Sequence, residues 1–132
     1  ADFARNQNLS FIQAERELGT PRHDLLGHAI CKNWDLPNYI MQVCRYHHTY
    51  SKIERIFNET DQINEYIDVV ILANHLARSL HVGYSGHSKC EEPVQLILKN
   101  LDLQEAFMQK ITPTIIAELK QGSFLDELLE TA

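Results

Sequence analysis

The chain has 132 residues, of which 44% are hydrophobic and 23% charged, and this ordinary globular composition excludes a disordered chain. Twelve basic and eighteen acidic residues give a formal net charge of −6. This charge, with no cluster of lysines or arginines, argues against nucleic acid and against an anionic membrane surface as partners. No apolar run is long enough to span a membrane, and no secretory signal opens the sequence.

The cysteines indicate the redox setting. Cys31, Cys44 and Cys90 are odd in number and form no CxxC pair. We therefore expect neither a disulfide framework nor a structural zinc site, and we expect a reducing, cytoplasmic location. Cys44 falls on an apolar helix face, where a thiol usually behaves as a small hydrophobic side chain.

The first part of the chain shows helical periodicity. A helix is expected over about residues 3–18, ending at Gly19, because glycine commonly follows a helix C-terminus. Thr20 and Pro21 then indicate the start of a second helix, whose apolar face is Leu26, Ile30 and Trp34. The stretch 35–37 separates it from a third helix, on which one face carries Leu36, Ile40, Val43, Cys44 and His47.

The second part of the chain is also expected to be helical. Residues 49–62 are polar, with one short turn near 53–57, and a long helix follows over about 63–81 with a stripe of Ile67, Val70, Ile71, Asn74, Ala77 and His81. A loop over 82–92 precedes a short helix that Pro93 opens. Asp102 and Glu105 resemble a capping box for the next helix, which Pro113 should kink or split. A last turn is expected over 124–130.

These patterns predict a single all-α domain over residues 1–132, a compact array of five to seven helices rather than a coiled coil. Because they share a phase on successive helices, we expect a buried core made of Trp34, Leu36, Ile40, Val43, Ile67, Val70 and Ile71.

Polar residues on three of these apolar faces mark a candidate site. His23, His47 (or His48) and Asn74 each lie in phase with apolar neighbours, so we expect them to meet within a few ångströms. Two interpretations remain open. The residues form a hydrogen-bonded cluster in the core, since a buried polar group without a partner costs about 1–3 kcal/mol. Alternatively, His23, His47 and His48 are imidazole ligands of a metal ion.

The order and spacing of several segments resemble the second half of an HDOD domain. These segments, which lie within about residues 10–120, are Ala14-Glu15-Arg16-Glu17-Leu18-Gly19, His23, Gly27, Trp34-Asp35-Leu36-Pro37, Tyr46-His47-His48 and the helix from Ile71 to Arg78. HDOD domains are all-α relatives of the HD phosphohydrolases and of the HD-GYP phosphodiesterases, and are mostly bacterial. The resemblance implies an HD-like helical array.

What the resemblance implies for function is a non-catalytic bacterial signal-transduction module. It would pass a conformational signal to a protein partner or to a fused receiver or cyclic-dinucleotide domain, and could form a homo-oligomer. The alternative is a metal-dependent phosphohydrolase that acts on a nucleotide or cyclic dinucleotide, because His23, His47 and His48 match metal-ligand positions of HD-GYP relatives.

Departures from the enzyme pattern favour the non-catalytic interpretation. Asn74 stands where HD enzymes keep a metal-binding aspartate, and an amide supplies no negative charge. Thr49-Tyr50-Ser51 follows the histidine pair in place of the phosphodiesterase motif, and His23-Asp24 does not match the doublet that names the superfamily. We therefore expect no catalytic residue and no bound cofactor, with the three histidines as a vestigial metal site beside Asn74.

Overall fold

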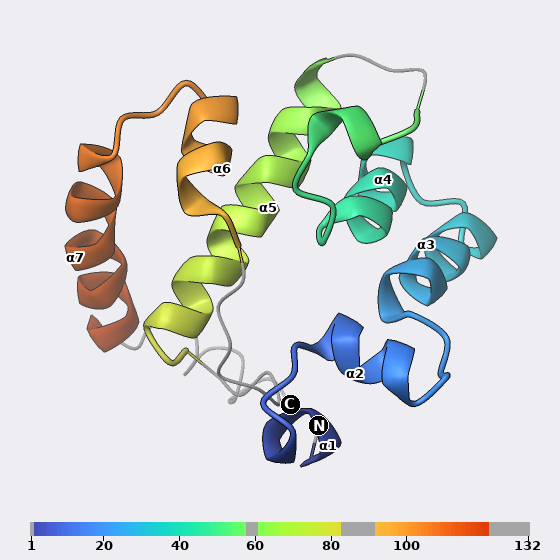
Figure 1. Ribbon diagram of the computed structural model, residues 1–132. Helices are drawn as coiled ribbons and strands as arrows, with labels where there is room; N and C mark the ends of the chain where they lie inside the picture. The colour runs from blue at the N-terminus through green and yellow to red at the C-terminus, as the bar shows by residue number, and fades with distance from the viewer. Residues whose placement is uncertain (1, 58–60, 83–91, 122–132) are drawn as a thin grey trace. The chain divides into compact units, whose positions relative to one another are not determined.

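The computed structural model describes residues 2–57, 61–82 and 92–121, which form seven α-helices and one short 3₁₀ turn (Figure 1). No strand occurs among these residues, so the predicted all-α class is confirmed and the helix number falls within the expected range. The chain divides into two compact units, residues 1–102 and 103–132. A single domain over 1–132 stays a prediction. Within the described ranges, no helix has the length and hydropathy needed to cross a bilayer.

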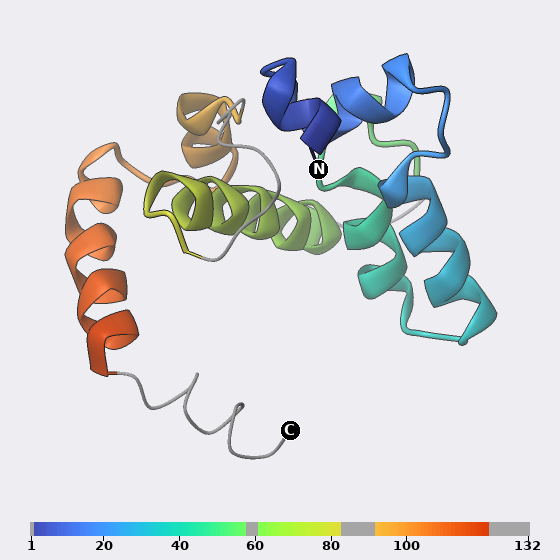
Figure 2. The same ribbon diagram turned by 90° about the horizontal axis from the view of Figure 1, so that it is seen from below.

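The first unit contains six of these helices. They are α1 (Asp2–Asn6), α2 (Phe11–Glu17), α3 (His23–Asn33), α4 (Asn38–Tyr46), α5 (Asp61–Ser79) and α6 (Val94–Asn100), with the 3₁₀ turn at Lys52–Glu54. In this unit α4 packs against both α3 and α5, and α5 also packs against α6 (Figures 1 and 2). The second unit contains α7 (Ala106–Gln121).

The expectation of one continuous helix over residues 3–18 is wrong, because the chain breaks between α1 and α2. Asn8 adopts a left-handed conformation with φ +52°. Ser10 then caps α2: its hydroxyl accepts a hydrogen bond from the backbone N–H of Gln13, and the Gln13 side chain accepts one from the N–H of Ser10. This reciprocal capping box satisfies two N–H groups that the helix leaves free, and it starts a new helix.

The expected helix end at Gly19 is confirmed. Gly19 has φ +63°, a conformation that costs glycine little because it has no Cβ. The N–H of Thr20 bonds to the carbonyl of Glu15 at 3.0 Å, and that of Gly19 to the carbonyl of Arg16 at 3.3 Å, which is a Schellman motif. The next helix begins later than Thr20 and Pro21 suggested, at His23, with Arg22 in the N-cap position.

The core of the first unit lies on one face of α5. Ile67 and Ile71 are fully buried there, as predicted. Val70, Leu36, Ile40 and Val43 are only half-buried. Further apolar side chains complete this core from α5 and α6: Ile63, Leu72, Leu76, Ile97 and Leu98.

The apolar face expected on α3 is not part of this core. Trp34 is 69% exposed, and Leu26 and Ile30 are each about half exposed, so the prediction of a buried Trp34 is wrong. The buried face of α3 instead carries Asp24 and Cys31, and Gly27 faces Cys44 on α4. Helix α3 therefore faces α4 through small and polar residues, and its larger apolar residues lie on the exposed side.

A buried ion pair that the sequence patterns did not indicate fastens the segment after α4 to α5. The side chains of Arg55 and Asp68 are both fully buried and in contact. Arg55 also donates to the carbonyl of Thr49 at 2.9 Å and to the side chain of Asn64 at 3.2 Å. The guanidinium thus binds backbone carbonyls of both the segment after α4 and α5, those of Thr49 and Asn64.

The last described helices differ in part from expectation. Pro93 precedes α6 as predicted, but Asp102 adopts φ +55° at the end of α6 and does not cap α7. Helix α7 continues through Pro113, so the helix is not split there, and the alternative expectation of a kink stays a prediction. The hydroxyls of Thr112 and Thr114 donate to carbonyls one turn earlier, those of Met108 and Lys110. Residues 83–91 of the expected loop and the expected turn at 124–130 lie outside the described residues.

Candidate histidine cluster

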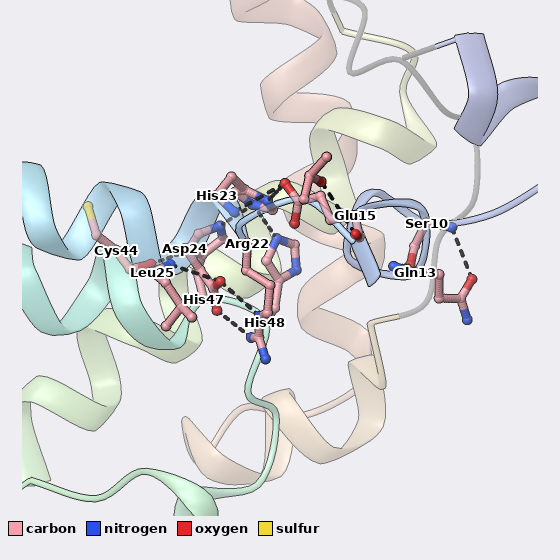
Figure 3. Close-up of polar contacts among 11 residues, drawn as sticks. Ser10, Gln13, Glu15, Arg22, His23, Asp24, Leu25, Cys44, His47 and His48 are labelled. Carbon is pink, nitrogen blue, oxygen red and sulfur yellow. Dashed lines mark hydrogen bonds and ion pairs between the residues drawn. The ribbon is translucent and has the colours of Figure 1, made fainter. Parts of the chain in front are cut away.

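Three histidine side chains converge at the junction of α2, α3 and the end of α4. The Nε2 atom of His23, in the first turn of α3, lies 3.3 Å from Nε2 of His47 and 3.0 Å from Nε2 of His48 (Figure 3). His47 follows the last residue of α4, and His48 is the next residue. The structure therefore brings together the three histidines that the sequence singled out, and the atoms that approach one another are the Nε2 nitrogens.

Glu15 on α2 fixes the position of His23. Its Oε1 atom accepts a hydrogen bond from the backbone N–H of His23 at 3.1 Å and lies 2.9 Å from Nδ1 of the ring (Figure 3). The carboxylate thus accepts a hydrogen bond from the first turn of α3, where free N–H groups favour a negative charge. It also orients the His23 imidazole. Sequence reasoning did not single out Glu15, because the residue acts across the turn between two helices.

Hydrogen bonds at Nδ1 determine which nitrogen of His47 carries its proton. Nδ1 of His47 lies 2.9 Å from the carbonyl oxygen of Cys44 and 3.3 Å from that of Val43. A carbonyl can only accept, so Nδ1 donates and Nε2 of the neutral ring carries a lone pair. The same reasoning applies to His23 beside the Glu15 carboxylate. Two lone pairs therefore face each other, an arrangement that a shared proton or a cation stabilises.

The charge state of the cluster at neutral pH follows from burial. Burial lowers the pKa of His48 from its ordinary 6.5 to about 3, and the neighbouring rings of His47 and His23 add to this effect. Burial also lowers the pKa of His47, although the carbonyl of Cys44 opposes the shift. Both rings are neutral at pH 7 and therefore keep the lone pairs that a metal ion needs.

Asn74 borders the same pocket. A cavity of about 330 Å³ is lined by Phe11, His23, His47, His48, Asn74, Ala77, Arg78 and Val82. Asn74 thus shares the pocket wall with the three histidines, and its expected approach to within a few ångströms of them stays a prediction. Arg78 brings a positive charge to its wall, although its guanidinium also pairs with the buried carboxylate of Glu92.

The donor set fits a divalent metal ion. Ligands at the usual zinc–nitrogen distance of about 2.0–2.1 Å in a tetrahedron lie about 3.3 Å apart, which is close to the two Nε2 separations around His23. All three ligand atoms lie within 4.8 Å of one another. Glu15 at the far nitrogen of His23 resembles the carboxylate that orients many metal-binding histidines. In the described part of the chain, however, no carboxylate joins this group of candidate ligands.

Asp24 does not act as a further ligand, although it follows His23 directly. Its carboxylate is buried and pairs with Arg22, whose Nε lies 3.0 Å from Oδ1. Burial alone would raise the pKa of Asp24, but the hydrogen bond and charge of Arg22 outweigh it and lower the pKa below its usual value. Asp24 therefore stays ionised as part of a local ion pair in the first turn of α3.

A comparison with known families agrees with the sequence resemblance. The family model described as HDOD domain matches residues 1–50, the segment that contains Glu15 and all three histidines. No curated protein and no solved structure matches the chain. The match does not support placing the chain as the second half of such a domain, and that placement stays a prediction. The resemblance to the HDOD domain family is confirmed over residues 1–50.

Proposed function

We propose that this chain is a non-catalytic signal-transduction module of the HDOD kind, working in the bacterial cytoplasm. The observation that carries the proposal is the composition of the histidine cluster, His23, His47 and His48, which offers imidazoles but no carboxylate as candidate ligands. Asn74 borders the pocket where HD enzymes keep an aspartate. A neutral amide supports neither the charge of a hydrolytic metal site nor general-base chemistry.

The proposed role of the histidine cluster is to connect helices. Glu15, His23 and His47 lie in sequence from α2 through α3 to the end of α4, and a proton or a cation shared between the two Nε2 atoms would connect the two rings. A movement of one of these helices would break contacts to the other two. Such a cluster suits a module that passes a conformational signal, because its contacts are made or lost together.

The proposed output is a contact with a protein partner or with a fused receiver or cyclic-dinucleotide domain. Support comes from the outward apolar face of α3, where Leu26, Ile30 and Trp34 are all exposed. A group of large apolar side chains in solvent is typical of an interaction surface. Association of the chain with a second copy through this face belongs to the same proposal.

The alternative is an HD-type phosphohydrolase that acts on a nucleotide or cyclic dinucleotide, and one observation favours it. The Nε2 atom of His23 lies from those of His47 and His48 at distances close to those between metal ligands, and Glu15 orients His23. His23, His47 and His48 would hold the ion, which would supply a polarised water when bound. Glu15 would keep His23 in the metal-binding tautomer.

Calorimetry with Mn²⁺ and Zn²⁺, paired with an assay for cleavage of a cyclic dinucleotide, separates the two functions. We expect no cleavage by the unaltered protein, whether or not Zn²⁺ binds. Asn74→Asp should bind Mn²⁺ at least about tenfold more tightly, because it adds the hard anionic ligand that manganese prefers. Asn74→Ser is the matched control and should gain nothing. Stoichiometric metal binding together with multiple turnovers by the unaltered chain would overturn the proposal.

A further inference from the structure

Two cysteines lie side by side where α3 packs against α4. Cys31 on α3 and Cys44 on α4 are 13 positions apart in sequence, and their Sγ atoms are 3.5 Å apart in a hydrogen bond. Both are free thiols. Cys31 is only 7% exposed, whereas Cys44 is half-buried. Sequence spacing gave no indication of this pair, because the two residues meet only through the packing of α3 against α4.

We propose that Cys31 and Cys44 form a reversible disulfide that locks α3 to α4 when the protein meets a hydroperoxide. A disulfide needs an S–S distance of about 2.05 Å, so the sulfurs must approach by about 1.5 Å. We expect rotation about the side-chain bonds of the two cysteines to supply this movement. Gly27 leaves room beside Cys44, since a Cβ at that position would lie 4.0 Å from its Sγ.

The exposure of the two thiols sets the order of the chemistry. The more accessible Cys44 attacks hydrogen peroxide as a thiolate, forming an S–O bond and releasing hydroxide. The Cys31 sulfur then attacks the Cys44 sulfur, the S–S bond forms, and the second hydroxide leaves. With the two thiol protons the balance is two thiols and one peroxide giving one disulfide and two waters. The cysteines lose two electrons, which reduce the peroxide oxygens.

The environment of Cys44 makes this a slow reaction. Burial and the neighbouring Cys31 raise the pKa of the Cys44 thiol to about 11. The thiolate is the nucleophile, so only a small fraction of Cys44 is reactive at pH 7. Because Cys31 is buried and Cys44 half-buried, peroxide reaches the pair with difficulty, and we expect slow oxidation rather than the rapid turnover of a peroxide-scavenging enzyme.

The pair is connected directly to the histidine cluster. The carbonyl oxygen of Cys44 accepts the hydrogen bond that orients the His47 ring, at 2.9 Å. A disulfide that draws Cys44 toward α3 changes the position of this carbonyl and with it the orientation of His47. The redox state of the pair is thereby transmitted to the cluster. The cross-linking chemistry itself stands whether or not the chain is a signalling module.

The test is oxidation of the intact chain with hydrogen peroxide, followed by mass spectrometry without reductant. We expect a loss of about 2 Da, from the two hydrogens removed, and a linked peptide pair containing Cys31 and Cys44. Dithiothreitol should reverse both. Cys90→Ser, which keeps both members of the pair, should form the same link, whereas Cys31→Ser and Cys44→Ser should not.

The NMR signal of the His47 ring tests the connection to the cluster. Its Cε1–H resonance should shift on oxidation and return on reduction, while that of His75 on α5 should stay in place. Sulfinic acids without a link, or a link through Cys90, would overturn the proposed disulfide. Formation of the disulfide with an unchanged His47 resonance would overturn its transmission to the cluster. Both results come from the unaltered chain, so neither depends on the folding of a variant.

Discussion

Two helices of the first unit carry apolar stripes that look alike in sequence but have opposite environments. On α5, which packs against α4 and α6, Ile67 and Ile71 are fully buried. On α3, Ile30 is about half exposed and Trp34 is 69% exposed. A helical stripe shows that a face is apolar, but not that the same unit covers it. The difference identifies α5 as the centre of the core and the outer face of α3 as surface available for contact.

The largest effect should come from the buried ion pair that joins α5 to the segment after α4. Asp68→Ala leaves the Arg55 guanidinium buried without its partner, and such changes cost about 3–5 kcal/mol in the free energy of unfolding. Asp24→Ala on α3 should cost clearly less, because Arg22 is 34% exposed and can be hydrated. Urea denaturation of both variants checks this prediction, and equal losses would contradict it.

The two stripes themselves provide the next comparison. Ile71→Ala should lower the free energy of unfolding by about 2–5 kcal/mol, because it leaves a cavity in a packed core. Ile30→Ala removes the same atoms from the exposed face of α3 and should cost less than about 1 kcal/mol. Denaturant unfolding measures both values. A loss under about half a kcal/mol for Ile71→Ala would show that the α5 face is assigned wrongly.

The histidine cluster shows what the sequence could predict and what it could not. His23 and His47 lay in phase with apolar neighbours, so their approach followed from helical periodicity, as did the place of Asn74 in the wall of the same pocket. The partner of His23, Glu15, and the Cys31–Cys44 contact depend on how separate helices pack, which no local pattern specifies. The prediction that Trp34 is buried was wrong for the same reason, because periodicity does not tell which apolar face packs against another helix.

Capping chemistry accounts for the remaining differences in the helix bounds. The break before α2 was marked in the sequence by Ser10 and Gln13, which form a capping box. The turn at Asp102 was misread, because an aspartate can start one helix or adopt a left-handed conformation at the end of another. Local residue types allow both choices, and only the neighbouring helices decide between them.

The contact between α3 and α4, where Cys44 of α4 lies against Cys31 of α3, offers a smaller, pH-dependent comparison. The pKa of Cys44 is raised to about 11 from 9.0 by burial and by Cys31. At pH 8, alkylation of Cys44 by iodoacetamide should therefore be about a hundredfold slower than in the urea-unfolded chain, and the rate should rise steeply up to about pH 11. Peptide mapping measures both rates. Similar rates in the folded and unfolded chain would show that the Cys44 thiol is accessible to the reagent and that α3 does not cover it.

The smallest effect concerns association through the outer face of α3. The unaltered chain should self-associate weakly as its concentration rises, because Leu26, Ile30 and Trp34 are exposed together. Trp34→Ser should weaken this association with little change in stability, since the side chain is already in solvent. Sedimentation velocity over a concentration series checks both points. A clean monomer at high concentration would count against this face as a self-association surface.

Turnover is the most direct test of whether the histidine cluster works as a connection between helices or as a catalytic centre. The measurement is product released per chain from excess cyclic dinucleotide, with the protein loaded with Mn²⁺ or Zn²⁺ and with His47→Ala as the matched background. The account predicts the same slow background release from both proteins, well below one product per chain. Many products per chain from the unaltered protein, lost in His47→Ala, would contradict it.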